Sequence, residues 1–383
     1  MKILMVSMFS PHFFNWADQL KDSGHEIYWL DIYDSNTFVE KIDFAEQIIG
    51  WRYKWDYPGR YRIKKTFPLV DIFFRKINER NIQKIFKNKL EEIKPDVVHS
   101  FVMYSACVPI LGVMKKYNRI KWIYSAWGND LFFYQNNPEY RRGMINVFPY
   151  LHYMFADCKR DYLIAKSLGY SSKYLGTYPT GGGYHFDDYQ AFINKKEDRN
   201  IILIKGYQHK FGRCNSVLDS LLKIYKKLEN YKIVVFAANN EVTEFANKIK
   251  LYDFVNLQII QRMEHEDVLK LMGESSIYIG NSISDGMPNT LLEAIIMEVF
   301  PIQSNPGGAT AEIIDHGKNG LLINDPEDSD EIANIISTAI EDNLMRNNAI
   351  KFNNLNIKPN LDRELVKEKV LEKYRTVEEE LNT

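Results

Sequence analysis

Short apolar runs that alternate with helix-forming stretches constrain the fold of this chain more than any other feature. Residues 1–6 (MKILMV) are typical of a buried strand, and residues 15–22 have a helical pattern that ends at Ser23-Gly24. A second strand is predicted over 26–30. Strand, helix and strand in such a short stretch indicate a parallel βαβ unit. The alternation continues with predicted strands over 96–99 and 121–125 and a predicted helix over 159–167.

The alternation starts again in the second half of the chain. A purely polar stretch, residues 195–199, leads us to place the domain boundary near residues 187–199. Two βα runs predict two Rossmann-like, doubly wound α/β domains that face each other across a cleft, with ligands at the carboxyl ends of the strands. The second run comprises predicted strands over 201–204, 232–236, 255–260, 277–279 and 301–303 and predicted helices over 217–228 and 291–299. The expected division is a domain over 1–190, a domain over 191–360, and residues 361–383, whose helix (361–381) could return to the first domain.

Length, composition and charge restrict the class of protein. The chain has 383 residues, which suits two globular domains, and its net charge of −1 provides no general attraction to nucleic acid. Three scattered cysteines, Cys107, Cys158 and Cys214, make no metal or redox spacing and favour a reducing compartment. The first apolar run is too short for a signal peptide, and no run is long enough to span a bilayer, so we expect a cytoplasmic protein.

The segment 284–314 (SDGMPNTLLEAIIMEVFPIQSNPGGATAEII) carries the most chemistry. A predicted strand ends in a loop, and Asn289 or Thr290 can cap the helix that follows. The start of a helix presents unpaired N–H groups and a partial positive charge, which suits a diphosphate. Asp285 lies just before that helix and Glu293 one turn inside it, so both carboxylates can accept hydrogen bonds from the hydroxyls of one ligand.

This segment resembles the donor site of retaining glycosyltransferases of the GT-B fold, in particular glycosyltransferase family four. The resemblance consists of two acids with seven residues between them, Asp285 and Glu293, followed by Pro301, Gly307-Gly308 and Glu312. Asp285 stands where the family usually has Glu, and Glu298 where it usually has a small residue. The resemblance implies that Asp285 acts at the sugar and Glu293 on the ribose, with further donor contacts from Gly286, Met287, Asn289, Thr290, Gly308 and Glu312.

A basic loop follows the first predicted strand of the second half. Residues 205–213 (KGYQHKFGR) include Lys205, Lys210 and Arg213, and cations at this place can bind a diphosphate and stabilise it as a leaving group. The resemblance implies that Arg213 acts there, with Lys205 or Lys210 as the second cation. Tyr207 occupies the usual arginine position of the family, so the loop departs from the family pattern. A solvated basic loop is the alternative.

The acceptor side is predicted in the first half. The first loop, expected over residues 7–15, has no glycine and contains His12, which could orient an acceptor or be purely structural. The string Trp127-Gly128-Asn129-Asp130 follows a predicted strand and resembles a cleft motif of some family members. It implies an acceptor-side role for Asn129 and a catalytic role for Asp130, for which a helix cap is the alternative.

Residues 51–90 are strongly basic and aromatic. They contain twelve Lys or Arg and three Asp or Glu, a balance of about +9, and the basic residues are interleaved with Trp, Tyr and Phe. Such a segment suits an anionic membrane surface or a phosphate-bearing acceptor. A solvated helix is the alternative. We therefore predict peripheral association with the inner face of a membrane as a hypothesis, and no nucleic-acid partner.

The resemblance implies transfer of a sugar from a UDP- or GDP-sugar, with retention of configuration, to a saccharide or lipid-linked acceptor. No cofactor or metal is expected, because the charge on the leaving diphosphate is met by cations and a helix start. Two alternatives stay open from the sequence. A nucleotide-sugar epimerase would turn over donor without acceptor, and a non-catalytic module would bind donor without consuming it.

Overall fold

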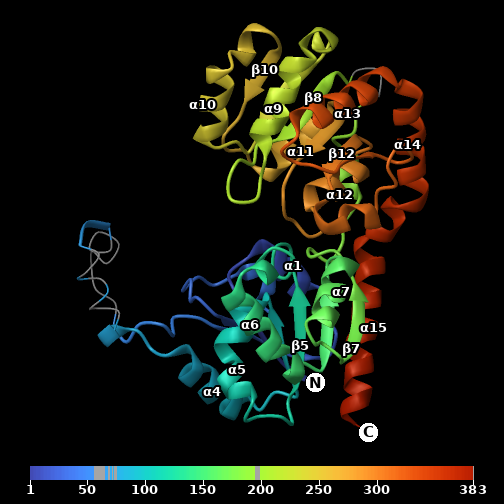
Figure 1. Cartoon of the computed structure of the whole chain (residues 1–383). Helices are drawn as coiled ribbons and strands as arrows, with labels where there is room; N and C mark the ends of the chain where they lie inside the picture. Colours follow the sequence, from blue (N-terminus) through green and yellow to red (C-terminus); the bar gives the residue numbers. More distant parts are fainter. Residues whose placement is uncertain (56–64, 68–69, 71, 73–75, 195–198, 383) are drawn as a thin grey trace. The chain divides into compact units, whose positions relative to one another are not determined.

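The computed structural model describes residues 1–55, 65–67, 70, 72, 76–194 and 199–382. The chain divides into two compact units. The N-terminal unit comprises Met1–Asp157, Asp161–Gly182 and the residues from Glu368 onward, and the C-terminal unit comprises Cys158–Arg160 and Gly183–Lys367. Figure 1 shows the elements of each unit. Most of the polar stretch at which we placed the domain boundary, residues 195–198, lies outside the described residues.

The N-terminal unit contains a seven-stranded sheet in the order β3-β2-β1-β4-β5-β6-β7. Every neighbouring pair is parallel, as the register of Ile3 beside Ile27 on one side and Val97 on the other illustrates. The strands are β1 (Lys2–Ser7), β2 (Glu26–Asp31), β3 (Glu46–Ile48), β4 (Val97–Phe101), β5 (Lys121–Ala126), β6 (Tyr153–Ala156) and β7 (Lys173–Thr177). The four strands predicted here are confirmed, and β3, β6 and β7 were not predicted.

Among its described residues, this unit has the helices α1 (Pro11–Asp18), α4 (Ile82–Ile93), α5 (Leu111–Met114), α6 (Pro138–Val147), α7 (Lys159–Ser167) and α15 (Arg363–Leu381). Helices α7 and α15 also contribute residues to the C-terminal unit. The prediction of a helix over 15–22 was wrong in its bounds. Helix α1 begins four residues earlier because Pro11 occupies its first turn, where the missing N–H of proline costs nothing. The predicted loop over 7–15 is therefore helical from Pro11.

The C-terminal unit contains a six-stranded parallel sheet in the order β10-β9-β8-β11-β12-β13. The strands are β8 (Ile201–Lys205), β9 (Lys232–Phe236), β10 (Asn256–Ile259), β11 (Ser275–Gly280), β12 (Phe300–Ser304) and β13 (Leu321–Ile323). The helices are α8 (Asp187–Gln190), α9 (Cys214–Lys223), α10 (Asn240–Lys248), α11 (His265–Gly273), α12 (Asn289–Ile296), α13 (Ser329–Glu341) and α14 (Asn343–Asn356). The helix predicted over 217–228 is shifted and breaks at Ile224, after which residues 225–228 form a 3₁₀ turn.

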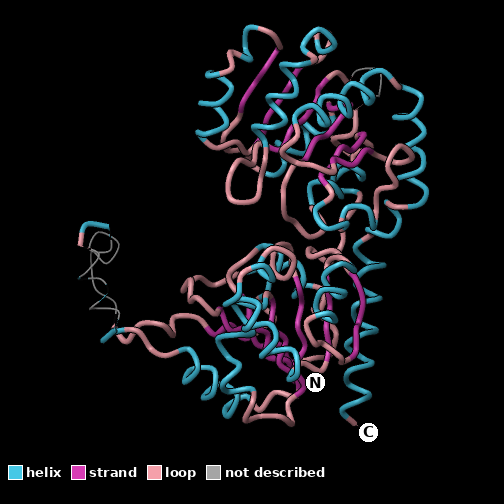
Figure 2. Tube along the Cα trace, viewed as in Figure 1, coloured by secondary structure: helices cyan, strands magenta, loops and turns pink. Residues whose placement is uncertain are grey.

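Both sheets are covered by helices, and this explains why their strands read as continuous apolar runs. Strand β4 is buried along its whole length, as are four of the five residues of β8. Figure 2 shows the strands of each unit in magenta with cyan helices around them. Because both faces of each sheet are buried, side chains reach a ligand mainly from the loops at the carboxyl ends of the strands.

Helix α15 is attached to the N-terminal sheet through Tyr374, a fully buried residue. The Trp16 indole N–H donates to the Tyr374 hydroxyl over 3.2 Å, and that hydroxyl lies 2.7 Å from His99 Nδ1. On the other side of the ring, His99 Nε2 lies 2.8 Å from Ser125 Oγ. Burial holds the pKa of His99 well below its usual range, so the ring is neutral and links the helix to strands β4 and β5 through hydrogen bonds.

Candidate functional site

Two loops predicted separately to contact one ligand lie side by side in the C-terminal unit. Residues 206–213 follow β8, and residues 281–288 follow β11, its neighbour in the sheet. The Ile283 N–H donates to the carbonyl of Phe211 over 2.9 Å, and the Arg213 N–H donates to the carbonyl of Asn281 over 3.0 Å. Gly212, which pairs with Ser282 of the acidic loop, is required by the fold of the basic loop itself, because a Cβ there would lie 2.3 Å from the Tyr207 carbonyl oxygen. The basic loop and the acidic loop therefore form one surface.

The cations of the basic loop differ in what holds them. Arg213 Nε donates to Glu327 Oε1 over 2.6 Å, and its Nη1 donates to the backbone carbonyl of His209 over 3.1 Å. Lys205 Nζ lies 4.2 Å from the centre of the Tyr207 ring, and Lys210 Nζ lies 5.3 Å from the centre of the Phe211 ring. Glu327 was not singled out in the sequence. Its side chain is 63% exposed, so an incoming anion can replace it at Arg213 without opening the fold.

Helix α12 begins at Asn289, directly after Pro288. The prediction that Asn289 or Thr290 caps this helix was wrong, because both residues lie inside the first turn and no side chain caps it. Instead, Thr290 Oγ accepts a hydrogen bond from the Tyr278 hydroxyl, and Asn289 Oδ1 accepts one from Tyr184. The first N–H groups of α12 therefore have no side-chain cap.

The loop before α12 contains polar atoms that lack partners. Asp285 Oδ1 accepts from the Gly286 N–H over 2.9 Å, and Met287 packs into the apolar core. Within the described part of the chain, Ser284 Oγ and Asn281 Oδ1 are buried and make no hydrogen bond. Buried polar atoms are almost always paired, so these two are candidates for contact with a ligand or an ordered water.

Glu293 lies inside α12 and is only 7% exposed. Its Oε1 lies 2.7 Å from Nε2 of His265, the first residue of α11. Hydrogen bonding to Glu293 raises the pKa of His265 above its usual value, against the effect of burial. His265 was missed in the sequence, although the segment that follows the predicted strand 255–260 leads from the ligand-binding edge of the sheet to this residue.

The predicted glycine turn and Glu312 lie in the same unit but in different surroundings. Gly307 and Gly308 both have positive φ, and a Cβ at Gly308 would meet no atom within 4 Å, so this turn leaves open space. Glu312 accepts the backbone N–H groups of Lys159 and Arg160 over 2.7 and 2.8 Å. Both Glu312 oxygens thus already hold backbone groups.

In the N-terminal unit, Asp130 is 1% exposed. Both carboxylate oxygens lie 2.8 Å from the Met103 backbone nitrogen, and the Tyr124 hydroxyl also donates to Oδ2. Burial raises the pKa of Asp130 to about 8, against the lowering effect of these hydrogen bonds. Because Met103 begins a π-helical turn (Met103–Cys107), this geometry favours the helix-cap alternative for Asp130.

The other two residues predicted on the acceptor side differ in exposure. Asn129 is partly buried, and its Oδ1 is buried without a hydrogen-bond partner among the described residues. His12 is exposed in the first turn of α1, and not in a loop as predicted. The structure therefore does not bring His12 into a buried polar cluster.

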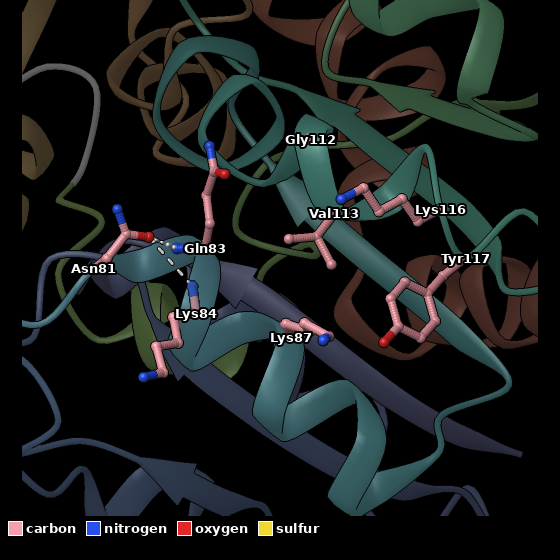
Figure 3. Close-up of a pocket in the computed structure, with 8 residues that line it drawn as sticks. All are labelled: Asn81, Gln83, Lys84, Lys87, Gly112, Val113, Lys116 and Tyr117. Carbon is pink, nitrogen blue, oxygen red and sulfur yellow. Dashed lines mark hydrogen bonds between the residues drawn. The ribbon is translucent and has the colours of Figure 1, made fainter.

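Part of the basic segment 51–90 lies outside the described residues, including Arg60, Arg62, Lys64 and Arg75. Its last part, α4, lines a surface pocket of ≈ 530 Å³, drawn in Figure 3. Lys84 and Lys87 come from α4, and Lys116 follows α5. Tyr117 also lines the pocket and donates to Glu91 over 2.7 Å. The described helices include none long and apolar enough to cross a membrane.

One group of described residues could hold a metal ion. Asp157, Cys158 and Asp161 are buried and place one ligand atom each within 4.8 Å of one another. The Gly128 N–H donates to Asp157 Oδ2 over 2.9 Å, so this carboxylate already has a structural contact.

Two family models match the chain. One, described as glycosyl transferases group 1, matches residues 186–354, and the other, described as glycosyl transferase 4-like, matches residues 2–167. The chain is 26% identical over 140 residues to a Campylobacter jejuni enzyme named as an α-1,4-N-acetyl-D-galactosaminyltransferase for a GalNAc-containing, undecaprenol-diphosphate-linked saccharide. It is 23% identical over 257 residues to an uncharacterized glycosyltransferase of Methanocaldococcus jannaschii. These alignments cover 36% and 59% of this chain and only 38% and 59% of the relatives.

Solved structures agree with the whole fold. Sucrose-phosphate synthase of Thermosynechococcus elongatus superposes with a TM-score of 0.75 at 13% identity, over 98% of this chain and 99% of that one. HepE of Anabaena, solved in complex with UDP and glucose, superposes with a TM-score of 0.69 at 14% identity, over 98% and 100%. At such low identity, these likenesses speak for the fold alone.

Proposed function

Because this chain belongs to the glycosyltransferases of the GT-B fold, we propose that it transfers a sugar from a nucleoside-diphosphate donor to a saccharide or lipid-linked acceptor with retention of configuration. The observation that supports the donor half is the pairing of the 206–213 and 281–288 loops beside the start of α12. This pairing puts cations, uncapped N–H groups and carboxylates at one edge of one sheet. A nucleoside diphosphate sugar needs these groups together.

In the proposed roles, Arg213 and Lys205 bind the diphosphate, together with the first N–H groups of α12. Glu293 accepts from the ribose hydroxyls, and Asp285 from a hydroxyl of the sugar. The bond between the anomeric carbon and the diphosphate breaks, and the acceptor oxygen bonds to that carbon from the same face. The departing phosphate oxygen takes the acceptor's proton, and the cations stabilise the charge that develops on the diphosphate.

We propose that no metal ion takes part, because two cations and a helix start supply the positive charge that the leaving diphosphate requires. Turnover should therefore be unchanged after incubation with EDTA. A loss of turnover that Mg²⁺ or Mn²⁺ restores would contradict this part of the proposal.

For the donor, we propose UDP as the first nucleotide to test, because the solved HepE complex contains UDP. A thermal-shift screen with UDP, GDP, ADP and CDP should show stabilisation by one of them, about 2–4 kcal/mol at saturating ligand. The shift should be clearly smaller in Glu293→Gln and unchanged in Glu266→Gln, a matched change at an exposed acid on α11. Stabilisation by none of the four nucleotides would contradict the donor site.

Product analysis then separates transfer from the two alternatives. With the bound nucleotide's sugars, an epimerase releases a changed nucleotide sugar without any acceptor, and a non-catalytic module leaves the donor intact. A transferase releases free nucleotide, and adding an acceptor speeds that release. The anomeric configuration of the glycoside, measured by NMR, tests retention directly.

For the acceptor, we propose a saccharide on an anionic lipid carrier, with the enzyme located in the cytoplasm at the inner membrane surface. The name of the Campylobacter relative and the basic pocket on α4 support this. Vesicles containing anionic phosphatidylglycerol should bind the protein in flotation, and salt should release it. The double change Lys84→Glu, Lys87→Glu should weaken binding, whereas Lys248→Glu, Lys250→Glu in the other unit should not. Equal flotation on neutral vesicles would contradict an electrostatic surface.

A further inference from the structure

Four tyrosines gather beyond the carboxyl ends of the N-terminal sheet. Tyr33 comes two residues after β2, Tyr104 three residues after β4, Tyr134 lies in the segment after β5, and Tyr140 lies in the first turn of α6. The ring centres of Tyr134 and Tyr140 are 4.6 Å apart, and Tyr104 lies 4.9 Å from Tyr134 and 5.8 Å from Tyr140. Tyr33 follows β2 at the same edge of the sheet, and its pKa is raised first by burial and then by the Tyr140 phenol. We name these residues the tyrosine cluster.

The position of the cluster is one at which parallel sheets bind ligands. The strand order β2-β1-β4-β5 reverses direction at β1, so the chain leaves β1 toward β2 on one side and later occupies β4 on the other. Open α/β sheets bind ligands outside the carboxyl ends of the strands at such a reversal. Tyr33 and Tyr104 follow the two strands that flank β1.

The backbone that carries Tyr104 is strained. Val102 has φ +72°, a conformation that a β-branched residue rarely adopts, and the π-helical turn Met103–Cys107 follows it. Asp130 is buried, and its carboxylate accepts a hydrogen bond from the Met103 N–H at the start of this turn. Such strained turns persist where the surrounding structure fixes them, and they are frequent at functional sites. Asp130 therefore positions Tyr104 and does not itself face a ligand.

The cluster is not an ordinary piece of core. Tyr33 is 51% exposed and Tyr140 36% exposed. Within the described part of the chain, the hydroxyls of Tyr33, Tyr104 and Tyr140 make no hydrogen bond. A tyrosine in a core usually pairs its hydroxyl, whereas Tyr33 and Tyr140 are exposed and Tyr104 is partly buried, each with an unused hydroxyl. None of the four side chains is charged, which makes a phosphate an unsuitable ligand.

We propose that the tyrosine cluster is the binding platform for the saccharide of the acceptor. A pyranose ring presents a face of C–H bonds that packs on an aromatic ring, and its hydroxyls need hydrogen-bond partners at the rim. Phenols supply both, with little side-chain entropy to lose. This inference rests on the proposed glycosyl transfer and adds to it the side chains that would hold the sugar rings of the acceptor.

The test uses the full chain and a panel of methyl glycosides of glucose, galactose, N-acetylglucosamine and N-acetylgalactosamine. Saturation-transfer NMR should detect binding of at least one glycoside, with its ring protons closest to the protein. Tyr33→Ala and Tyr140→Ala should each weaken that binding roughly threefold to tenfold. Tyr33→Phe and Tyr140→Phe should weaken it less, because they keep the ring. Tyr150→Ala, at a 37% exposed tyrosine of the same unit outside the cluster, should leave it unchanged.

Donor binding, measured on the same variants by thermal shift, separates this inference from the proposed function. Weaker glycoside binding with an unchanged nucleotide shift supports the platform. Wild-type protein that binds no glycoside, or variants that bind it as well as wild type, would overturn the platform while nucleotide binding leaves the transferase proposal standing. Saturation transfer from an alkyl chain, such as that of octyl glucoside, without transfer from its sugar ring would also overturn it and indicate a lipid site.

Discussion

Asp130 and Glu293 are both buried carboxylates near the carboxyl ends of parallel strands, yet their surroundings differ. Asp130 is 1% exposed and accepts hydrogen bonds from a backbone N–H and a buried phenol. Glu293 is 7% exposed, and its one hydrogen-bond partner among the described residues is His265, whose side chain is 63% exposed. Burial alone therefore does not show whether an acid could contact a ligand. The partner does, because an exposed partner can be replaced by a ligand.

The same contrast holds for a few further residues of each unit. In the C-terminal unit, Arg213 is held by the exposed Glu327, and buried oxygens of Ser284 and Asn281 lack partners. In the N-terminal unit, the polar residues His99, Tyr374 and Asp130 are paired with one another or with backbone. We therefore expect substitutions in the first set to change donor turnover, and substitutions in the second set to change stability.

The largest expected effect is on the leaving group. Arg213→Ala should lower kcat/KM for donor turnover by about 10²–10³, because it removes a cation that stabilises the developing charge. Tyr207→Ala should change it by only a few fold, since a phenol supplies no charge. The steady-state rate of nucleotide release measures kcat/KM for both variants. The reverse ranking would mean that the cation acting on the diphosphate lies elsewhere in the loop.

A matched change tests the partner of Arg213. Glu327→Gln keeps the size of the side chain but removes its charge, so Arg213 becomes easier to recruit by a diphosphate. We expect nucleotide affinity equal to or slightly above that of wild type, measured by calorimetry. A strong loss of affinity in Glu327→Gln would show that Glu327 orients Arg213 and does not compete for it.

The second prediction tests the two carboxylates directly. Glu293→Gln should raise the nucleotide dissociation constant about 10- to 100-fold, because hydrogen bonds to a charged group are worth about 1.5–3 kcal/mol. Its melting temperature without ligand should remain close to that of wild type. Asp130→Ala should instead lower the melting temperature. It leaves the Met103 N–H and the Tyr124 hydroxyl unpaired in the core, at about 1–3 kcal/mol each, with nucleotide affinity unchanged. A loss of nucleotide affinity in Asp130→Ala would contradict the proposed difference in role between Asp130 and Glu293.

The sequence predicted the strands well for a physical reason. Both sheets are parallel and covered on both faces, so most of their strands are apolar runs that a sequence pattern reveals. The strands that were missed, β3, β6, β7 and β13, are only three to five residues long. Helix bounds were less predictable, because caps decide them. The start of α1 depended on Pro11, and the break after α9 on Ile224, whose φ of −120° leaves the helical range.

The site was only partly predictable. Arg213 ends the loop after β8, and Glu293 lies in the helix that follows the loop after β11, so a one-dimensional pattern can place both near the same sheet edge. Their partners could not be read in the same way, since Glu327 is 114 residues from Arg213 and His265 is 28 residues from Glu293. Such pairs depend on tertiary structure. The burial of Asp130 was equally invisible, because a string such as Asn129-Asp130 looks the same at a surface loop and under a strained turn.

The third prediction concerns the buried polar link of α15. Tyr374→Phe should lower the free energy of unfolding by about 1–3 kcal/mol, because it leaves the Trp16 indole N–H and one His99 nitrogen without a partner. Chemical denaturation measures this loss, and nucleotide affinity should not change. Tyr252→Phe, at a 43% exposed tyrosine, is the control and should be neutral. A neutral Tyr374→Phe would mean that a water molecule satisfies the freed groups.

The smallest expected effect is a difference in pH dependence between two histidines. Burial lowers the pKa of His99, so the unfolded chain binds a proton that the native state does not, and His99 removes stability as pH falls below about 6.5. The loss is up to about 1.4 kcal/mol per pH unit.

Hydrogen bonding to Glu293 raises the pKa of His265. The stabilising contribution of protonated His265 is therefore present in full below pH 6.5 and is lost as pH rises through the higher pKa of the folded state. The free energy of unfolding of wild type minus that of His265→Gln should therefore decrease from pH 6 to pH 8.5. The corresponding difference between wild type and His99→Gln should increase. If both differences changed with pH in the same direction, the two histidines would have similar environments, which would contradict the contrast between the two units.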